Sequence, residues 1–252
     1  MKLRILGSAT SIGVPVIGCD CPVCTSSDPH NFRTRTSATF EHDGRVLLID
    51  ASTDFRMQAL RHKLERVDAV LLTHAHADHV GGLDDLRGFN FLQREVIPVH
   101  AGARTLREVR LRFAYIFEET QVGGGKPMID LVPIDGPFKA ADFHVTPVPL
   151  FHGELKILGF RVGRAAYCTD VSEIPEESFP LLEDLDVLVI DALRHKRHPT
   201  HFNLEQALEA IERIRPRRAV LTHLTHVFDH AALAAELPDF VEPAYDGLVI
   251  EL

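Results

Sequence analysis

Four side chains that commonly bind metals lie within six consecutive residues: His74, His76, Asp78 and His79. They directly follow the apolar segment Ala69–Thr73, which predicts a buried β-strand. Several imidazoles and a carboxylate crowded at a strand end would lack partners if buried, whereas a divalent cation satisfies them all and keeps the imidazoles neutral. A solvated polar loop is the alternative, but this spacing favours metal binding. His74 and His76 point the same way in an extended chain and can share one ion, so Asp78 and His79 can hold a second.

Three cysteines form a second cluster near the N-terminus. Cys19, Cys21 and Cys24 have the spacing C-x-C-x-x-C. Three thiols this close in a reduced protein suit a structural Zn²⁺, which needs a fourth ligand from elsewhere in the chain. Free or redox-active cysteines are the alternative.

The elements that must position these clusters alternate between strands and helices. Asp43-Gly44 predicts a tight hairpin between two short strands. The clearest helix is Leu204–Ile214, with Asn203 as its N-cap and Gln206 three residues later. The other expected strands are Leu3–Leu6, Ala38–His42, Arg45–Ile49, Phe143–Leu150, Leu158–Val162, Ala165–Cys168, Val187–Ile190, Ala219–Thr222 and Leu248–Leu252, and the other expected helices are Asp84–Leu92 and Thr105–Arg112. Residues 114–128 are irregular and read as a surface loop rather than a lid.

Composition excludes several classes of protein. The 252 residues carry 27 Lys and Arg against 36 Asp and Glu, a net charge of −9, and 45% are hydrophobic. This apolar fraction is too high for a disordered chain, and four cysteines are too few for a disulfide scaffold. The acidic balance disfavours a general nucleic-acid binder. No run is long enough to span a membrane, and no signal peptide is evident, so we expect a soluble, cytoplasmic protein.

We expect one domain of mixed α and β layers, residues 1–252, with a zinc-binding loop at about 8–36.

The histidine motif resembles the H-x-H-x-D-H signature of the metallo-β-lactamase superfamily. Three further candidates each follow an expected strand, in the order of that family's remaining ligands: His152, Asp170 and His223. The resemblance covers nearly the whole chain and implies a four-layer αββα sandwich with two metals at one edge of the sheets. It assigns His74, His76 and His152 to one metal, Asp78, His79 and His223 to the other, and Asp170 as the bridge between them.

The cysteine cluster sharpens this resemblance. C-x-C-x-x-C near the N-terminus, together with a histidine three residues after the last catalytic ligand, is similar to the PhnP-like phosphoribosyl cyclic phosphodiesterases. Cys19, Cys21, Cys24 and His226 match that pattern. The resemblance implies a structural zinc that pins the N-terminal loop beside the active site, and two catalytic divalent ions, Mn²⁺ or Zn²⁺.

A phosphodiester leaving group needs a proton, so the site needs a general acid. We assign this role to His201, which lies just before the helix Leu204–Ile214 and matches a histidine segment of PhnP-like and ribonuclease Z-like enzymes. His195 and His198 stand close by in the sequence, and which of the three is the acid stays open. Asp78 is counted as catalytic because it is a metal ligand.

Cations should contact a phosphate-bearing substrate. Arg33, Arg35 and Arg87 are candidates, although an exposed arginine is more often simply solvated. Asp50 ends a strand near the metal loop and could orient a ligand histidine.

Our leading hypothesis is a dinuclear-metal phosphodiesterase that hydrolyses a small cyclic phosphodiester, such as phosphoribosyl 1,2-cyclic phosphate, by attack of a metal-bound hydroxide. One alternative is a ribonuclease Z-like tRNA 3′-processing endonuclease, which usually carries a basic arm that we do not find. Another is a pyrroloquinoline quinone biosynthesis-type relative, in which the histidine motif is typically degraded. We also expect a homodimer, no extended nucleic-acid surface and no membrane contact.

Overall fold

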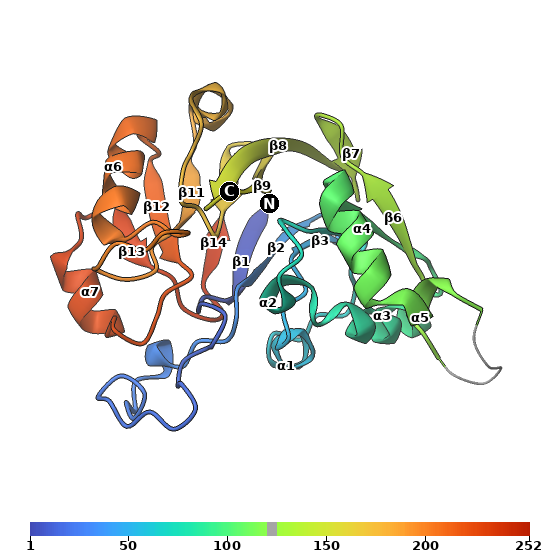
Figure 1. Cartoon of the computed structure of the whole chain (residues 1–252), viewed down its shortest axis with the longest axis horizontal. Helices are drawn as coiled ribbons and strands as arrows, with labels where there is room; N and C mark the ends of the chain where they lie inside the picture. The colour runs from blue at the N-terminus through green and yellow to red at the C-terminus, as the bar shows by residue number, and fades with distance from the viewer. Residues whose placement is uncertain (120–124) are drawn as a thin grey trace.

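Two seven-stranded sheets pack face to face and carry helices on their outer faces (Figure 1). The computed structural model describes residues 1–119 and 125–252. The order of strands is β14-β1-β2-β3-β4-β5-β6 in the first sheet and β13-β12-β11-β10-β9-β8-β7 in the second.

The first sheet is antiparallel on one side and parallel on the other. Pairs are antiparallel from β14 to β3 and parallel from β3 to β6. Its strands are β1 (Lys2–Gly7), β2 (Ser37–His42), β3 (Arg45–Ile49), β4 (Ala69–Leu71), β5 (Ile97–Ala101), β6 (Ile129–Pro133) and β14 (Val249–Glu251). The carboxyl ends of β3, β4, β5 and β6 therefore meet at one edge of the sheet.

The second sheet has the same mixed character. Pairs are antiparallel from β7 to β10 and parallel from β10 to β13. Its strands are β7 (Phe138–Ala140), β8 (Phe143–His152), β9 (Leu155–Val162), β10 (Ala165–Cys168), β11 (Val187–Asp191), β12 (Arg218–Thr222) and β13 (Val241–Pro243). Because β8 runs in the same direction as β10, the carboxyl ends of β8, β10, β11 and β12 also share an edge.

Three apolar cores separate four layers. The central core joins the inner faces of both sheets through side chains such as Phe40, Phe160 and Tyr167. The outer core of the first sheet packs on α1 (Phe55–Arg61), α3 (Leu86–Gln93) and α4 (Ala103–Arg112), and that of the second packs on α6 (Leu204–Ile214) and α7 (His230–Glu236). The expected αββα sandwich is confirmed. The shorter helices are α2 (Ala77–Val80), α5 (Ala114–Phe117) and the 3-10 turns η1 (Pro29–Asn31), η2 (Leu83–Asp85) and η3 (Glu176–Leu182).

Local sequence signals explain the best-predicted elements. Asp43 and Gly44 both have positive φ, 47° and 73°, as the two-residue turn between β2 and β3 requires. Asn203 and Gln206 form a complete capping box at the start of α6, whose bounds match the expectation. No described helix is long and apolar enough to cross a membrane.

The irregular segment 114–128 differs in part from the expectation. Its first four residues form the short helix α5, in which Ile116 is buried. Residues 120–124 lie outside the described part of the chain. The expectation of a surface loop rather than a lid over 114–128 includes these residues.

Candidate metal centre

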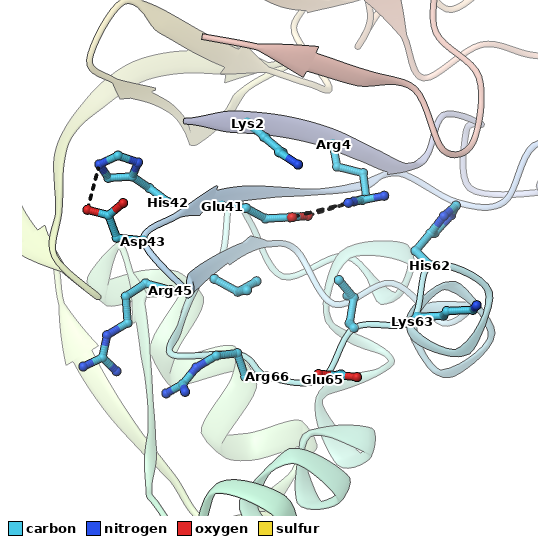
Figure 2. A pocket seen from close by; sticks show the side chains of 13 residues that line it. Lys2, Arg4, Glu41, His42, Asp43, Arg45, His62, Lys63, Glu65 and Arg66 are labelled. Atoms are coloured by element: carbon cyan, nitrogen blue, oxygen red, sulfur yellow. Dashed lines mark hydrogen bonds and ion pairs between the residues drawn. The ribbon is translucent and has the colours of Figure 1, made fainter.

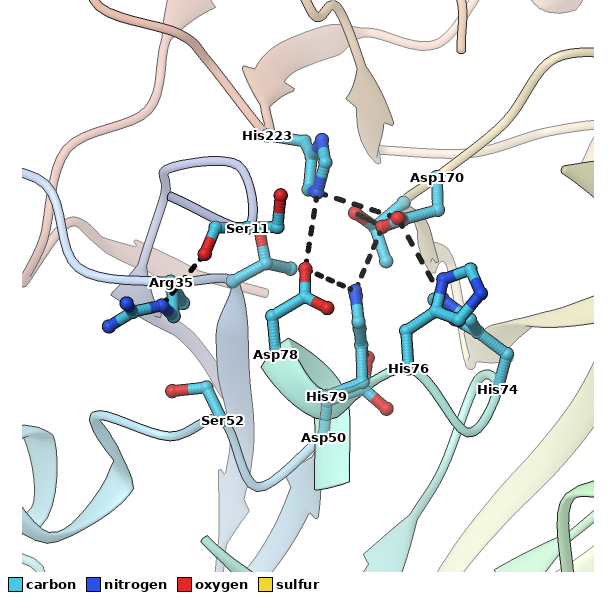
Figure 3. Close-up of polar contacts among 12 residues, drawn as sticks. Ser11, Arg35, Asp50, Ser52, His74, His76, Asp78, His79, Asp170 and His223 are labelled. Atoms are coloured by element: carbon cyan, nitrogen blue, oxygen red, sulfur yellow. Dashed lines mark hydrogen bonds and ion pairs between the residues drawn. The ribbon is translucent and has the colours of Figure 1, made fainter. Parts of the chain in front are cut away.

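Polar residues converge where the strands of both sheets end (Figure 3). The first sheet supplies Asp50 after β3 and His74 after β4, and α2 adds Asp78 and His79. The second sheet supplies His152 at the end of β8, Asp170 after β10, Asp191 at the end of β11 and His223 after β12. Asp50, Asp170 and His223 have positive φ values of 57°, 60° and 61°. Such backbone conformations cost energy in residues other than glycine and concentrate at functional sites.

One group of histidines lies at the outer end of this edge. His74 Nε2 is 2.9 Å from His76 Nδ1, and His152 joins them with all three ligand atoms within 4.8 Å of one another. His74 and His152 are buried, whereas His76 is exposed. Three imidazoles converging this closely match the donor set of a divalent transition metal.

A second group combines carboxylates with histidines. Asp78, His79, Asp170 and His223 place their ligand atoms within 4.8 Å of one another. His79 Nε2 and His223 Nε2 are buried and have no hydrogen-bond partner in the described structure. A buried imidazole nitrogen without a partner is costly, and a cation at this position would satisfy both nitrogens at once. The residues therefore fit a metal ion.

Asp170 touches both groups. Its Oδ1 lies 3.2 Å from His79 Nε2, and its Oδ2 lies 3.4 Å from His223 Nε2 and 3.9 Å from His74 Nε2. Figure 3 shows the three dashed contacts radiating from this carboxylate. Oδ1 thus faces the second group and Oδ2 lies between the two groups, a position that suits a bridging ligand.

Neighbouring groups fix the far nitrogens of the ligand histidines. His79 Nδ1 lies 2.7 Å from Asp50 Oδ2, and His152 Nδ1 donates to the Thr200 carbonyl at 2.7 Å. Asp50 also accepts hydrogen bonds from the backbone N–H and hydroxyl of Thr73. These contacts direct each Nε2 toward the centre, which is how outer partners orient metal ligands. The orienting role expected for Asp50 thus has a geometric basis.

Burial and charge set the protonation of the centre. Burial lowers the pKa of His74 and of His152, which keeps their rings neutral and able to bind a metal. Burial alone would raise the pKa of Asp78, but the neighbouring imidazoles of His223 and His79 bring it well below its usual value. The carboxylate of Asp78 is therefore ionised at neutral pH, as a ligand must be.

His201 lies between the two groups and is held by a residue that sequence reasoning missed. Its Nδ1 is 2.8 Å from Oδ2 of Asp191, which is fully buried. The His201 ring is 4.5 Å from that of His152 and 4.8 Å from that of His223. Asp191 ends β11 much as Asp50 follows β3. A carboxylate at the end of a buried strand is therefore the sequence feature that could have identified Asp191.

The neighbouring histidines are placed differently. The ring of His195 packs on Phe228 at 4.6 Å. His198 is 5.2 Å from His201 between ring centroids and lies 3.2 Å from the Thr200 hydroxyl. Among the three candidates for the acid, His201 is the one whose ring stacks on metal-ligand candidates.

The cysteine cluster meets its expected fourth partner. His226 Nδ1 lies 3.4, 3.5 and 3.4 Å from the sulfur atoms of Cys19, Cys21 and Cys24. Zinc bonds of about 2.3 Å to sulfur and about 2.0 Å to nitrogen, at tetrahedral angles, put these atoms about 3.5 Å apart. The four residues therefore fit a tetrahedral zinc ion. A hydrogen bond from the Cys24 backbone lowers the pKa of Cys21 to about 6, which favours the thiolate.

Arg33 does not fit the expected contact with substrate. Only 1% of the residue is exposed. Its guanidinium donates to the carbonyls of His30, Thr225 and Phe228 and to the Asn31 side chain. These bonds tie the N-terminal loop to the segment that carries His226, so Arg33 has a structural role and the expectation was wrong.

The other two arginines occupy different surroundings. Arg35 Nη1 pairs with Asp54 at 2.9 Å and its Nε donates to the Ser11 carbonyl, on the side of the site beyond Asp78 (Figure 3). Arg87 pairs with Asp84 at 2.6 Å and lines a hollow between α1 and α3 that includes none of the metal-ligand candidates. The structure thus brings Arg35, but not Arg87, near the centre.

Comparisons with known proteins agree with this geometry. Residues 45–224 match the family model described as a beta-lactamase superfamily domain. The crystal structure of a new diphosphatase from the PhnP family is similar over 100% of this chain and 97% of its own, with 40% identity and a TM-score of 0.93. Zn²⁺-bound PqqB from Methylobacterium extorquens, 21% identical over the full length of both chains with a TM-score of 0.81, shares the fold.

One curated relative is much longer than this chain. An octanoyltransferase from Porphyromonas gingivalis (strain ATCC BAA-308 / W83) is 44% identical over 98% of this chain and 51% of its own length. The chain thus spans about half of that relative, whose other half is unmatched. Its name therefore does not by itself describe the shared half.

Proposed function

Because the chain belongs to the β-lactamase superfamily, with a metallo-β-lactamase fold and a PhnP-like sequence, we propose that it hydrolyses a small phosphodiester with two divalent metals. Phosphoribosyl 1,2-cyclic phosphate is our candidate substrate. One observation carries the proposal: Asp170 contacts both ligand groups, and His201, fixed by Asp191, lies beside them.

Each residue has a stated task in this proposal. Two divalent ions held by His74, His76 and His152 and by Asp78, His79 and His223 would supply Lewis-acid activation of water and neutralise charge on the phosphoryl oxygens. Asp170 fixes the position of the two ligand groups relative to each other, and Asp191 binds Nδ1 of His201. His201 Nε2 is thereby free to donate a proton to the departing sugar oxygen. Arg35 is the remaining candidate for a phosphate contact.

Diphosphate hydrolysis is a second candidate. The PhnP-family relative at 40% identity is described as a diphosphatase, and a diphosphate offers the same phosphoryl oxygens to a two-metal centre. The two candidates differ in the leaving group, a sugar oxygen in one case and a phosphate in the other. A phosphate needs less help from an acid, so the dependence on His201 distinguishes them.

The charge pattern away from the centre argues against an RNA substrate. A cation-rich hollow of about 400 Å³ lies on the first sheet and contains Lys2, Arg4, Arg45, Lys63 and Arg66 (Figure 2). Its cations are largely matched by acids. Arg4 Nε lies 2.8 Å from Glu41, and Arg45 and Arg66 share Asp68. Paired cations neutralise few phosphates, so we propose a small substrate and no extended nucleic-acid surface.

The proposal includes three metals and a cellular setting. We assign Zn²⁺ to the cysteine cluster and Mn²⁺ or Zn²⁺ to the catalytic pair, since histidine and carboxylate ligands suit both. None of the four cysteines forms a disulfide. This suits the cytoplasm, where thiols stay reduced.

We further propose a homodimer, which size-exclusion chromatography with light scattering tests directly.

Turnover of matched substrates tests the function. The Mn²⁺- and Zn²⁺-loaded protein should hydrolyse bis(p-nitrophenyl) phosphate and a ribose cyclic phosphate, and Asp170→Ala should abolish both activities. Hydrolysis of a diphosphate but of neither diester would favour the second candidate. Absence of any phosphoester or diphosphate hydrolysis by the metal-loaded protein would contradict both.

A further inference from the structure

A cavity of about 560 Å³ lies one strand further along the sheet edge that carries the ligands. Its walls include Thr73 after β4, Gly102 after β5 and the segment 134–137 after β6. The metal-ligand candidates of the first sheet follow β4 at the same edge. Neighbouring strands are about 4.8 Å apart, so the cavity and the centre are within reach of one small molecule.

One wall of the cavity touches a ligand residue directly, and a second lies one residue from another. The Thr73 hydroxyl lies 3.0 Å from His74 Nδ1. On the other side, Lys156 of β9 pairs with Phe151 of β8, the residue that precedes His152. The Leu158 backbone N–H donates to the Thr73 carbonyl at 3.2 Å and joins the two walls. The cavity walls therefore include backbone segments that also carry metal-ligand candidates.

The lining of the cavity is mainly apolar. Its side chains include Ile134, Leu158 and Leu181 and three prolines, Pro137, Pro147 and Pro149. Prolines lack an N–H group and present rigid hydrocarbon rings. Arg104, which pairs with Glu108 at 3.0 Å, stands in the same lining with Lys156 and Asp135. An apolar floor with charges of both signs beside it suits the hydrocarbon portion of a ligand.

We propose that this cavity binds the apolar, non-reacting group of a phosphoester whose phosphate lies at the metal centre. The inference rests on the proposed function and favours phosphoesters with a hydrocarbon substituent over the polar phosphoribosyl candidate. Sites of this volume normally enclose most of a small ligand, and each buried methylene group strengthens binding by up to about fourfold.

Gly102 offers a way to fill the cavity without straining the fold. A Cβ added there would meet only Leu158 Cδ1, at 3.9 Å, and the glycine has φ −60°, which any residue can adopt. Gly102→Leu therefore places a side chain against the cavity wall. Gly88→Leu is the matched control, because a Cβ at Gly88 meets nothing within 4 Å and Gly88 lines the separate apolar hollow between α1 and α3.

The test is calorimetric titration of the metal-loaded proteins with methyl-, butyl- and hexylphosphonate, which bind without being hydrolysed. In the wild type and in Gly88→Leu, affinity should rise at least tenfold from methyl- to hexylphosphonate. In Gly102→Leu this gain should vanish while methylphosphonate binds unchanged. An equal gain in Gly102→Leu, or no gain in the wild type, would overturn the inference.

The titration separates this inference from the function on which it rests. Methylphosphonate is too small to use the cavity, so its binding reports the metal centre alone. If methylphosphonate binds but chain length has no effect, the cavity assignment fails and the proposed function stands. If no phosphonate binds to the metal-loaded protein, the proposed phosphate site itself fails.

Discussion

Three histidines of the centre, His79, His152 and His201, are held in the same way at the level of single residues. Each presents one ring nitrogen to the centre and anchors the other: His79 on Asp50, His152 on the Thr200 carbonyl and His201 on Asp191. Such anchoring fixes the tautomer before any ligand arrives. His201 differs from the other two because it lies within reach of both ligand groups and is left free to carry a proton.

We predict that the effect of His201→Ala depends on the leaving group. General acid catalysis contributes about 10²- to 10⁴-fold, and a leaving group that departs as a stable anion needs less of it. The kcat for an alkyl phosphodiester should fall by at least about 100-fold, whereas that for a p-nitrophenyl ester should fall far less. His198→Ala is the control and should change neither rate. Equal losses on both esters would exclude His201 as the acid.

The pH profile gives an independent prediction for the same residue. Burial lowers the pKa of His201 below its ordinary value of 6.5. Only the protonated ring can donate, so turnover of the alkyl ester should decline as pH rises through that lowered pKa. Steady-state rates between about pH 5 and pH 9 measure this decline. The decline should be absent in His201→Gln, and its persistence there would assign it to another group.

Sequence alone identified the ligand candidates but not all of the residues that orient the histidines of the centre. The spacing of His74, His76, Asp78 and His79 is a local feature, and the resemblance to the superfamily supplied His152, Asp170 and His223. Asp191 was missed because its role depends on contact with His201, ten residues away on another element. Arg33 was misassigned for a similar reason: an arginine in a polar loop reads as exposed, and only packing against the His226 segment buries it.

At the level of elements, Arg33 and the cysteine cluster both hold the loop between β1 and β2. Burial lowers the pKa of Arg33 to about 10, and the group remains charged at neutral pH. Its bonds to three carbonyls leave buried acceptors if the guanidinium is removed. The guanidinium and the cysteine cluster thus attach the same loop to the end of β12.

Arg33→Leu should lower the free energy of unfolding by about 3 kcal/mol, because buried acceptors would lose their donors. Chemical denaturation measures this directly. Arg35→Leu is the control, since its side chain is partly exposed and its pairing with Asp54 is worth about 1 kcal/mol or less. Unchanged stability of Arg33→Leu together with a raised KM would restore the original assignment to substrate binding.

Elements with strong local signals were predicted, and elements that tertiary contacts define were not. The β2–β3 hairpin and α6 carry a turn dipeptide and a capping box. In contrast, β5 contains Pro98, which usually argues against a strand inside a sheet, and its parallel partners come from distant segments. The helix α1 has Asp54 as its N-cap residue, but the Asp54 carboxylate bonds Arg35 instead of capping the helix, a contact that tertiary structure decides.

At the level of the whole molecule, acidity and charge pairing should exclude nucleic acids. The net charge is −9 with neutral histidines, and bound divalent ions would offset part of it locally at the centre. We predict no measurable tRNA binding in a fluorescence-anisotropy titration at 50 mM salt, where phosphate contacts are strongest. Micromolar binding that weakens steeply with salt would instead favour the ribonuclease Z-like alternative.

The central claim is that the chain carries a two-metal centre and a separate structural zinc. Metal analysis of the purified protein by plasma mass spectrometry tests it most directly. The account predicts about three metals per chain, of which Cys21→Ser loses one and Asp170→Ala loses the catalytic pair while retaining the zinc. One metal per chain in the wild type, or loss of the catalytic pair together with the zinc in Cys21→Ser, would contradict it.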